Sequence, residues 1–497
     1  MITRTLQRFQ FDSLVINGDD STPIFRQLEE QLRNAITQQR LLANERLPST
    51  RKLSQQLRIS RNTVINAYEQ LTNEGYIVTA HGSGTRVNPH ALNNATECYS
   101  NTNNNKKKID ISHTALIASQ ADNIVPKADG GSSRAFRAHT PACKEFPSTL
   151  WAQLMSQRLR SQADIWLERN HPCGYTPLRQ AISGYLGASR GINASSDEVI
   201  ITAGTQQSID LLAKLLINEG DIVCFEEPGY TPASTVFEMA GASIRSIPVD
   251  NEGISIDYLE KYVPEAKVIY VTPSSHFPLG MCMSLERRNA LLKWAKKNDT
   301  IIIEDDYNGE YRYQGNPLPS LQTLATSQHV IYLGSFSKLL FPALRLGYML
   351  VPAELINAIS TLRWLIDRHS PTLEQAVLTD FIDLGHFARH LRRMRHLYSQ
   401  RQKALVEAAN IYLTDIMQVP PLPTGLHLIG WLNHGVAEND VLLACEKASI
   451  EVMACSRFSA LPTERPSVIL GYAPYTEEVI HEGIKAIADA WETLSVK

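Results

Sequence analysis

The stretch LGSFSKLLFPALRLGYML, from Leu333 to Leu350, holds a single lysine and a single arginine in an otherwise mostly apolar segment. Lys338 comes just after the apolar run HVIYL at 329–333, and Arg345 lies seven residues further on. Ligands of parallel α/β sheets bind beyond the carboxyl ends of strands, and an apolar setting makes the neutral amine of a lysine accessible. The stretch therefore predicts a chemically used lysine at a sheet edge. Taken alone, Lys338 is more simply a solvated surface lysine.

Six short apolar runs, with helical segments between many of them, surround this stretch. They are EVIIT at 198–202, DIVCFEEP at 221–228, ASIRSIPVD at 242–250, KVIYVTP at 267–273, TIIIEDD at 300–306 and HVIYLGS at 329–335. Near-continuous apolar strands that alternate with helices indicate a largely parallel sheet covered on both faces. The pattern predicts an α/β large domain beyond about residue 131, and the last hundred residues predict a smaller α+β domain.

Polar residues at several of these strand ends form a set suited to a phosphate. Gly204, Thr205 and Gln206 directly follow EVIIT at the start of a predicted helix, where free backbone N–H groups and the helix dipole favour an anion. Ser335 and Ser337 add hydroxyl donors, and Arg345 adds a charged fork. Each motif alone is weak, since a Gly-Thr pair is also an ordinary strand-to-helix turn.

Other strand ends supply groups for a planar ring. Tyr230 follows DIVCFEEP and can stack on a flat cofactor. Asp305 lies near the end of TIIIEDD, where it can pair with a protonated ring nitrogen, and Tyr307 lies two residues later. Asp305 and its neighbour could equally cap a helix. Together, phosphate cup, stacking ring, nitrogen partner and Lys338 predict one cofactor, pyridoxal 5'-phosphate.

The first ninety residues have a different pattern. Apolar residues at Ile24, Leu28, Leu32, Ile36 and Leu41 mark one helical face, and LPSTRKLSQQLRIS and RNTVINAYEQLTNEGY predict two further helices. YIVTAHGSGTRVN then alternates around a glycine turn, as in a β-hairpin. The pattern predicts a winged helix-turn-helix, mainly α with a β wing, at residues 14–88.

The third of these helices predicts a DNA-reading element. Its first turn carries Ser60, Arg61, Asn62 and Thr63, residue types that reach base edges or phosphates from a recognition helix. On pattern alone, a generic helical bundle is about as good a reading. LPSTRKLSQQLRISRNTVINAYEQLTNEGYI followed by HGSGTRV resembles the GntR-family DNA-binding domain. That resemblance implies operator contacts at Arg51, Ser60, Arg61, Thr63, His81 and Gly82.

Composition and charge agree with such a division. The chain has 497 residues, which predicts at least two domains. Residues 1–90 carry 11 Lys+Arg and 8 Asp+Glu, a balance of +3, and the other residues carry 37 (48 − 11) and 43 (51 − 8), a balance of −6. The Asn- and Lys-rich segment NNATECYSNTNNNKKKID lies between them, and we expect a flexible linker at 89–130.

The remaining sequence features exclude several classes of protein. The seven cysteines include no C-x-x-C pair, which argues against a zinc ribbon or a disulfide framework, and no metal site is expected. The N-terminal residues lack the apolar core of a signal peptide, and no apolar run is long enough for a membrane span. We expect a cytoplasmic bacterial protein that is nucleoid-associated when bound to DNA.

Residues 140–495 resemble the class I/II aminotransferases of fold type I, and the whole chain resembles the MocR subfamily of GntR-family transcription regulators. The domains expected are 14–88, 89–130 and 131–497, the last as a cofactor-binding effector and dimerisation domain. The resemblance implies that Lys338 forms the internal aldimine, Asp305 pairs with the pyridine nitrogen, Tyr307 lies near the phenolic oxygen and Tyr230 stacks on the ring. It assigns Gly204, Thr205, Gln206, Ser335, Ser337 and Arg345 to the phosphate.

The chain departs from the aminotransferase pattern at three places. Phe277 stands where aminotransferases have an asparagine on the cofactor's ring oxygen, so His276 becomes a candidate for that contact. Arg169 stands where relatives often have a tyrosine that reaches the partner subunit's phosphate. The substrate-carboxylate arginine has only Arg465 and, further upstream, Arg457 as candidates. These departures weaken the prediction of transamination more than that of cofactor binding.

Three functions remain open from the sequence. The first is a homodimeric regulator, with domain swapping of the heads as an option, that binds repeated half-sites in double-stranded DNA and senses an amine, an amino acid or pyridoxal phosphate. The second is a working aminotransferase with a DNA-binding appendage. The third is a DNA-binding protein whose body serves only for dimerisation. The sequence does not determine the effector, the target genes, activation or repression, or whether transamination turns over.

Overall fold

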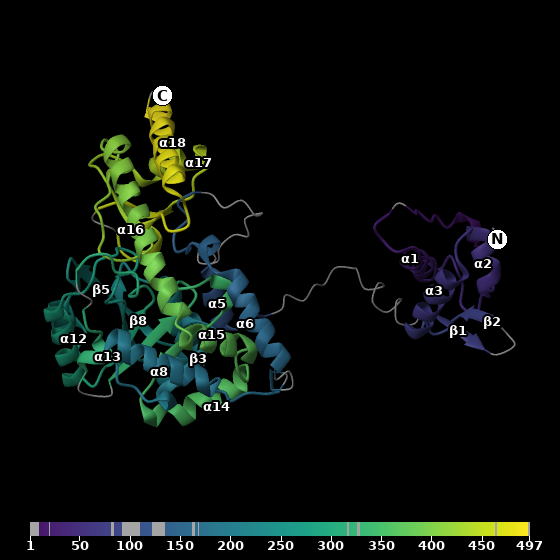
Figure 1. The fold of residues 1–497 in the computed structure, drawn as a ribbon, viewed down its shortest axis with the longest axis horizontal. Helices are drawn as coiled ribbons and strands as arrows, with labels where there is room; N and C mark the ends of the chain where they lie inside the picture. Colours follow the sequence, from purple (N-terminus) through teal and green to yellow (C-terminus); the bar gives the residue numbers. More distant parts are fainter. Residues whose placement is uncertain are drawn as a thin grey trace. The chain divides into compact units, whose positions relative to one another are not determined.

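The computed structural model describes residues 9–18, 20–80, 84–91, 110–121, 135–161, 165–166, 168–315, 318–325, 329–462 and 465–495. The chain divides into two compact units, Met1–Asp110 and Ile111–Lys497 (Figure 1). Each unit has its own hydrophobic core, with Leu28, Leu53 and Val64 in the first and Ile209, Leu291 and Tyr398 among those in the second. Each is therefore described by itself.

The first unit is a winged helix-turn-helix, as the sequence predicts. Its helices are α1 (Ile24–Thr37), α2 (Thr50–Leu57) and α3 (Arg61–Asn73), and its wing strands are β1 (Ile77–Ala80) and β2 (Gly84–Val87). Of the predicted apolar positions, Leu28, Leu32 and Ile36 of α1 and Leu41 beyond it lie in the core with α3 and the wing, whereas Ile24 is only half-buried. Ser49 caps α2 by accepting from the Lys52 N–H at 3.3 Å, and Ser60 caps α3 by accepting from the Thr63 N–H at 3.1 Å. These caps fix where the two helices begin.

The second unit is built on an eight-stranded sheet in the order β3-β10-β9-β8-β7-β4-β5-β6. The strands are β3 (Val199–Thr202), β4 (Ile222–Glu227), β5 (Ser243–Asp250), β6 (Gly253–Ile254), β7 (Val268–Val271), β8 (Ile301–Asp306), β9 (Val330–Ser335) and β10 (Gly347–Leu350). Each of the six predicted runs forms one of these strands. The pairs β4–β5, β4–β7, β7–β8 and β8–β9 are parallel.

The sheet departs from the predicted parallel arrangement at β10. This strand pairs antiparallel with both β9 and β3, with Gly347 opposite Ser335 and Thr202. The quoted stretch therefore leaves β9, passes through a short 3₁₀ turn at Pro342–Leu344 and returns along the same sheet. As a result, Lys338 and Arg345 lie on one connection between two neighbouring strands.

Helices cover both faces of this sheet (Figure 1). Since side chains alternate along a strand, Ile303 of β8 packs toward α9 (Thr205–Leu216), α10 (Thr231–Met239) and α14 (Ile356–Ile366). Ile302 packs toward α11 (Ile256–Tyr262), α12 (Leu285–Lys297) and α13 (Leu321–Leu324). Further helices are α6 (Ser148–Ser161), α8 (Thr176–Arg190) and α15 (Thr372–Asp383), which share a third cluster with β3 and β10.

A smaller α+β subdomain follows, in agreement with the sequence. Its antiparallel sheet has the order β11-β12-β14-β13, formed by β11 (Met417–Gln418), β12 (His427–Leu432), β13 (Met453–Ala454) and β14 (Ser467–Gly471). The long helix α16 (His386–Tyr412) runs up from the large sheet into this subdomain beside α18 (Glu477–Ser495), and α17 (Glu438–Lys447) also contacts α18 (Figure 1).

The predicted linker at 89–130 contains one described helix, α5 (His113–Gln120), which contacts α10. Ser112 caps this helix by accepting from the Ala115 N–H at 3.2 Å. Part of the segment thus belongs to the second unit. None of the helices in the described ranges is long and apolar enough to span a membrane.

Candidate functional sites

Lys338 lies on the connection between β9 and β10 with its amine largely buried. Its Nζ donates to the backbone oxygen of His139 at 2.6 Å. Burial lowers the pKa of Lys338 from 10.5 to about 8, although the nearby Asp305 acts in the opposite direction. A substantial share of the amine is therefore neutral near physiological pH, as a nucleophile or carbonyl-binding group requires.

The residues predicted to bind the phosphate come together around the N-terminus of α9. Gly204 precedes the helix with φ 114°, and the first N–H groups of a helix have no partner within it. A Cβ placed on Gly204 would lie 3.5 Å from Nη2 of Arg345, so the guanidinium lies against this turn. The Ser337 N–H donates to the Ser335 hydroxyl at 3.3 Å, which places both serines on the same connection as Lys338. Arg345 itself is exposed.

Asp305 of β8 lies near enough to Lys338 for the two charges to act on each other. Its Oδ2 accepts from the Tyr270 hydroxyl at 2.5 Å, whereas its Oδ1 is buried with no partner among the described residues. Burial raises the pKa of Asp305 to about 7, and Lys338 acts to lower it. A cationic ring nitrogen at Oδ1 would remove this penalty, since an opposite charge favours the ionised carboxylate.

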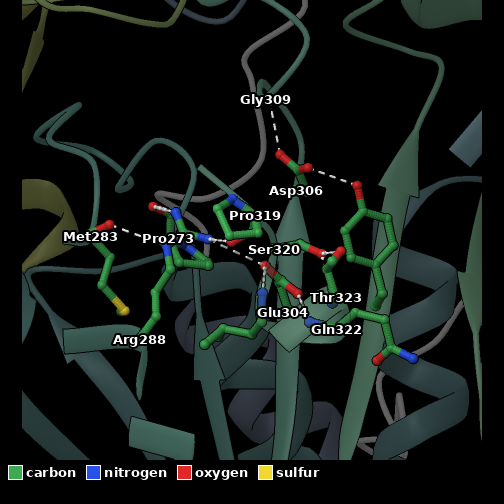
Figure 2. Close-up of polar contacts among 12 residues, drawn as sticks. Pro273, Met283, Arg288, Glu304, Asp306, Gly309, Pro319, Ser320, Gln322 and Thr323 are labelled. Carbon is green, nitrogen blue, oxygen red and sulfur yellow. Dashed lines mark hydrogen bonds and ion pairs between the residues drawn. The ribbon is translucent and has the colours of Figure 1, made fainter. Parts of the chain in front are cut away.

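The two neighbouring acids of β8, Glu304 and Asp306, lie on the opposite face of the strand from Asp305, since side chains alternate. Figure 2 shows their contacts. Asp306 accepts from the Gly309 N–H at 2.9 Å and the Tyr332 hydroxyl at 2.7 Å, and Arg190 Nη2 lies 3.0 Å away. Glu304 accepts from two backbone N–H groups at the start of α13, each at 2.9 Å. Strand alternation thus leaves Asp305 alone with an unsatisfied oxygen.

Arg288 of α12 fixes the loop that follows β7 (Figure 2). Its guanidinium donates to the backbone oxygens of Pro273 at 2.7 Å, Met283 at 3.1 Å and Pro319 at 3.1 Å, and its Nη1 lies 3.8 Å from Glu304. The side chain is almost wholly buried. Because the loop between Pro273 and Met283 carries the aromatic wall of the site, Arg288 is a positioning residue.

That aromatic wall centres on Phe277. The Phe277 ring lies 5.3 Å from Tyr230, 6.2 Å from Tyr307, 4.9 Å from Phe458 and 4.9 Å from His139, measured between ring centroids. Tyr230 donates through its hydroxyl to Gln206 Oε1 at 3.3 Å, which joins the predicted stacking ring to the phosphate turn.

His276 lies beneath this wall and is fully buried. The Leu279 N–H donates to its Nδ1 at 3.4 Å, so its Nε2 carries the proton and is a donor without a partner among the described residues. Burial lowers the pKa of His276 to about 3 and raises that of Glu226, 3.8 Å away, to about 7. His276 is therefore neutral near pH 7, and its contact with Glu226 is not a salt bridge.

The residues present fit pyridoxal phosphate. Within the described part of the chain, buried side-chain atoms without a hydrogen-bond partner gather here: Asp305 Oδ1, Tyr307 OH, Ser337 Oγ, Ser275 Oγ, His276 Nε2, His139 Nε2 and His427 Nδ1. Such unsatisfied buried groups are costly and call for an explanation, of which a bound ligand is one. An acid for a ring nitrogen, hydroxyls for oxygens and a helix N-terminus for a phosphate match the cofactor's groups.

Three predicted arginines lie outside this cluster. Arg465 donates to Gln418 at 3.1 Å and lies over the Trp431 ring. Trp431 is near one end of β12, whereas His427 is at the other end. Arg457 is exposed on the 3₁₀ turn Cys455–Phe458. Arg169 is exposed and lines a surface hollow of 330 Å³ beside α15. The contacts described for Arg465 and Arg169 do not include Lys338.

Four predicted DNA-binding residues, Ser60, Arg61, Asn62 and Thr63, lie at the start of α3 in the first unit, whereas Arg51 lies in the first turn of α2. Arg51, Ser60, Arg61 and Asn62 are exposed, and Thr63 is half-buried. The Ser60 hydroxyl also hydrogen-bonds the Thr63 hydroxyl at 2.8 Å. His81 and Gly82 lie outside the described residues. The described part presents the exposed helix N-terminus that a recognition helix requires.

Sequence reasoning missed five residues that shape the site: His139, Tyr270, Arg288, His427 and Phe458. Tyr270 lies in the buried run KVIYVTP, where a phenol hydroxyl among apolar neighbours was an available signal. The others come from loops, helices and the small subdomain, and their sequence neighbours form no motif. Only folding brings them to Lys338.

Comparison with known proteins agrees with this architecture. The model of aminotransferase class I and II matches residues 148–465, and that of bacterial regulatory proteins of the gntR family matches residues 25–87. The chain is 35% identical to the probable rhizopine catabolism regulatory protein MocR of Rhizobium meliloti, over 97% of this chain and 96% of that protein. It is 28% identical to the pyridoxine biosynthesis transcriptional regulator PdxR of Corynebacterium glutamicum, over 96% and 98%.

A solved structure supports the fold of the second unit. Kynurenine aminotransferase of Pyrococcus horikoshii superposes with a TM-score of 0.68 at 28% identity, covering 80% of this chain and 98% of that one. Fold and sequence together define a DNA-binding regulator that joins a GntR-type helix-turn-helix to a fold type I aminotransferase body. The chain belongs to the MocR type of HTH transcriptional regulators. The fold of its body implies binding of pyridoxal phosphate.

Proposed function

We propose that this regulator holds pyridoxal phosphate at Lys338 and uses it to sense an amine, an amino acid or the cofactor itself. The observation that carries the proposal is the group of unsatisfied buried atoms around a lysine whose pKa lies near 8. When bound, pyridoxal phosphate supplies an aldehyde that reacts reversibly with primary amines, together with an electron-withdrawing ring.

The chain's own residues take distinct parts in holding that group. The N-terminus of α9 with Gly204, Thr205 and Gln206 supplies backbone donors to the phosphate, and Arg345 adds the charge. Asp305 would pair with the ring nitrogen, and Tyr270 holds the carboxylate in place through its hydroxyl. Tyr230 would cover the ring. His276 Nε2 would donate to the ring oxygen, a contact for which aminotransferases have an asparagine where this chain has Phe277.

Sensing requires that the two states of the protein bind the effector with different affinity. The segment that contains His139 forms one wall of the Lys338 site, and the small subdomain forms another through His427. A ligand in the site therefore contacts this segment, the small subdomain and the large sheet domain at once. We infer that the resulting rearrangement of these three parts changes DNA binding by the helix-turn-helix. Exposed Arg61 and Asn62 read the operator.

A homodimer forms part of the same proposal. Arg345 and Arg169 are exposed in the single chain, although one lies at the phosphate turn and the other stands where relatives reach a partner's phosphate. A second copy that covers these arginines would complete the site, and two DNA-binding heads would read repeated half-sites. Light scattering of the full chain tests this, and a monomeric mass at micromolar concentration would contradict it.

The decisive experiment measures binding of the full chain to its own upstream DNA, with and without pyridoxal phosphate and a series of amines. We expect a ligand-dependent change of affinity or footprint in the wild type and in the matched control Lys293→Ala, on the exposed face of α12. Lys338→Ala should abolish this change and retain basal DNA binding. If neither cofactor nor amine alters affinity or footprint, the sensor proposal is wrong.

A functional aminotransferase with a DNA-binding appendage is the second candidate. It is favoured by the depressed pKa of Lys338 and by the pairing of Asp305 with Tyr270. The position of Arg465, at the end of β12 away from His427, weighs against it. Steady amino-acid-dependent conversion of a keto acid, lost in Lys338→Ala, would establish this activity.

A further inference from the structure

Two histidines outside every predicted motif lie beside Lys338. The backbone oxygen of His139 accepts from Lys338 Nζ at 2.6 Å, and its ring lies 4.9 Å from the rings of both His427 and Phe277. His427 is the first residue of β12 in the small subdomain, and Lys338 acts electrostatically on both imidazoles. The pair therefore forms part of the wall that faces the lysine.

A glycine on the neighbouring strand fixes this pair. Gly471 of β14 lies opposite His427, and its N–H donates to the Phe136 oxygen at 2.9 Å. A Cβ at Gly471 would lie 2.2 Å from the Arg137 oxygen, far inside contact distance. The absence of a side chain thus lets the chain before His139 cross over β14. The crossing sets His139, with φ 61°, over the lysine.

The protonation of His427 is fixed by its own contacts. Its Nε2 lies 2.8 Å from the backbone oxygen of Pro278, and because a carbonyl oxygen only accepts, Nε2 carries the proton. Burial lowers the pKa of His427 to about 4, so the ring is neutral at pH 7. Nδ1 is consequently a lone-pair acceptor, buried and without a partner among the described residues. Only a hydrogen-bond donor can satisfy it.

The surroundings of His427 Nδ1 are poorly suited to a carboxylate. Among the described residues, the cations that act on Tyr230, Asp305 and His427 are Lys338 and Arg345, whose guanidinium lies at the phosphate turn. Arg465 is held at the far end of β12. The remaining wall is aromatic, formed by Phe277 and Phe458. A carboxylate here would meet a lone pair and apolar rings.

We propose that His427, with His139, determines effector specificity, and that the effector is a carboxylate-free primary amine whose far end carries a hydrogen-bond donor such as a hydroxyl. This proposal rests on the proposed function, because the amine end is held at the Lys338 site. His427 Nδ1 accepts from the hydroxyl, and His139 Nε2, also buried without a partner among the described residues, offers a second contact. An α- or ω-amino acid of the same length is excluded by its charge.

The test uses the full chain loaded with pyridoxal phosphate and two probes of equal length, 3-aminopropan-1-ol and β-alanine. Binding is followed by the change in visible absorbance of the bound cofactor and by calorimetry. We expect the amino alcohol to bind at least about tenfold more tightly than the amino acid, the factor that a buried acceptor left without a donor imposes. In His427→Phe this preference should disappear.

Two further variants separate specificity from misfolding. His427→Gln retains an acceptor and a donor, so it should recover a preference for the amino alcohol if hydrogen bonding is the cause. Arg465→Ala, remote from the site, should leave both affinities unchanged. Equal or tighter binding of β-alanine in the wild type, or loss of β-alanine binding in Arg457→Ala, would overturn the proposal. Failure of the wild type to bind pyridoxal phosphate at all would instead refute the proposed function.

Discussion

Replacing Asp305 with asparagine should stabilise the cofactor-free protein while it abolishes tight cofactor binding. Asparagine retains an oxygen to accept from Tyr270 but carries no charge. Burial raises the pKa of Asp305 from 3.8 to about 7 in the folded chain. Below the unfolded pKa the carboxyl is protonated in both states, and its contribution to stability is fully present. As pH rises from the unfolded pKa through the raised folded pKa, the unfolded chain ionises first, and folding loses this stability.

The size of the effect follows from this shift. At about 1.4 kcal/mol for each pKa unit, the ionised carboxylate costs at most about 4 kcal/mol above pH 7 and roughly 1.6 kcal/mol at pH 5. For a unit of this size, with about 2 °C of melting temperature per kcal/mol, Asp305→Asn should raise the midpoint of the cofactor-free protein by up to about 8 °C at pH 8. At pH 4 the difference should nearly vanish.

The neighbouring residue supplies a matched control of opposite sign. Asp306 has the same length and strand but lies against Arg190 and accepts from Tyr332. Asp306→Asn should therefore destabilise the protein, by roughly 1–3 kcal/mol. Differential scanning fluorimetry of both variants from pH 4 to 8, without cofactor and with saturating pyridoxal phosphate, provides the assay.

The outcome is sharpest in the cofactor titration. The wild type should gain stability with pyridoxal phosphate at pH 8, and Asp305→Asn should gain little, because the neutral amide cannot pair with a ring cation. Equal melting temperatures of wild type and Asp305→Asn at pH 8 without cofactor would refute the reasoning about burial. Equal stabilisation of both by the cofactor would refute the role of Asp305.

Three further outcomes follow from the same contacts. Arg288→Met removes three hydrogen bonds to buried backbone oxygens and should cost about 3–5 kcal/mol of stability, whereas Lys293→Met on the exposed face of the same helix should change the chemical-denaturation midpoint little. Covalent uptake of pyridoxal phosphate at Lys338, followed by absorbance, should rise with pH around a midpoint near pH 8 and level off above it. A midpoint near the ordinary lysine pKa of 10.5 would contradict the burial of the amine. Arg61→Ala should weaken operator binding by roughly 10- to 100-fold and leave cofactor binding intact. Fluorescence anisotropy with operator and random DNA duplexes measures this. An equal loss of affinity for both duplexes would mean that Arg61 contacts only phosphate.

The sequence alone determined the elements and the chemistry of the cofactor groups. Apolar runs with near-continuous hydrophobicity predict β4, β7, β8 and β9 because both faces of this sheet are covered by helices. Helix caps are local, so Ser49 and Ser60 could be predicted as the starts of α2 and α3. A lysine, an aspartate and a phosphate turn at strand ends carry their chemistry in residue type and spacing.

Only the tertiary structure decided the rest. The antiparallel return of β10 places Arg345 against Gly204, more than a hundred residues away in the chain, and a short apolar run does not reveal its direction. The acceptor at His427 exists because Pro278, on a distant loop, fixes the ring's proton. Arg465 lies away from Lys338 because the register of β12 and β14 places it at the other end of the sheet. Sequence spacing carries no information on such contacts, because the packing of separate elements creates them.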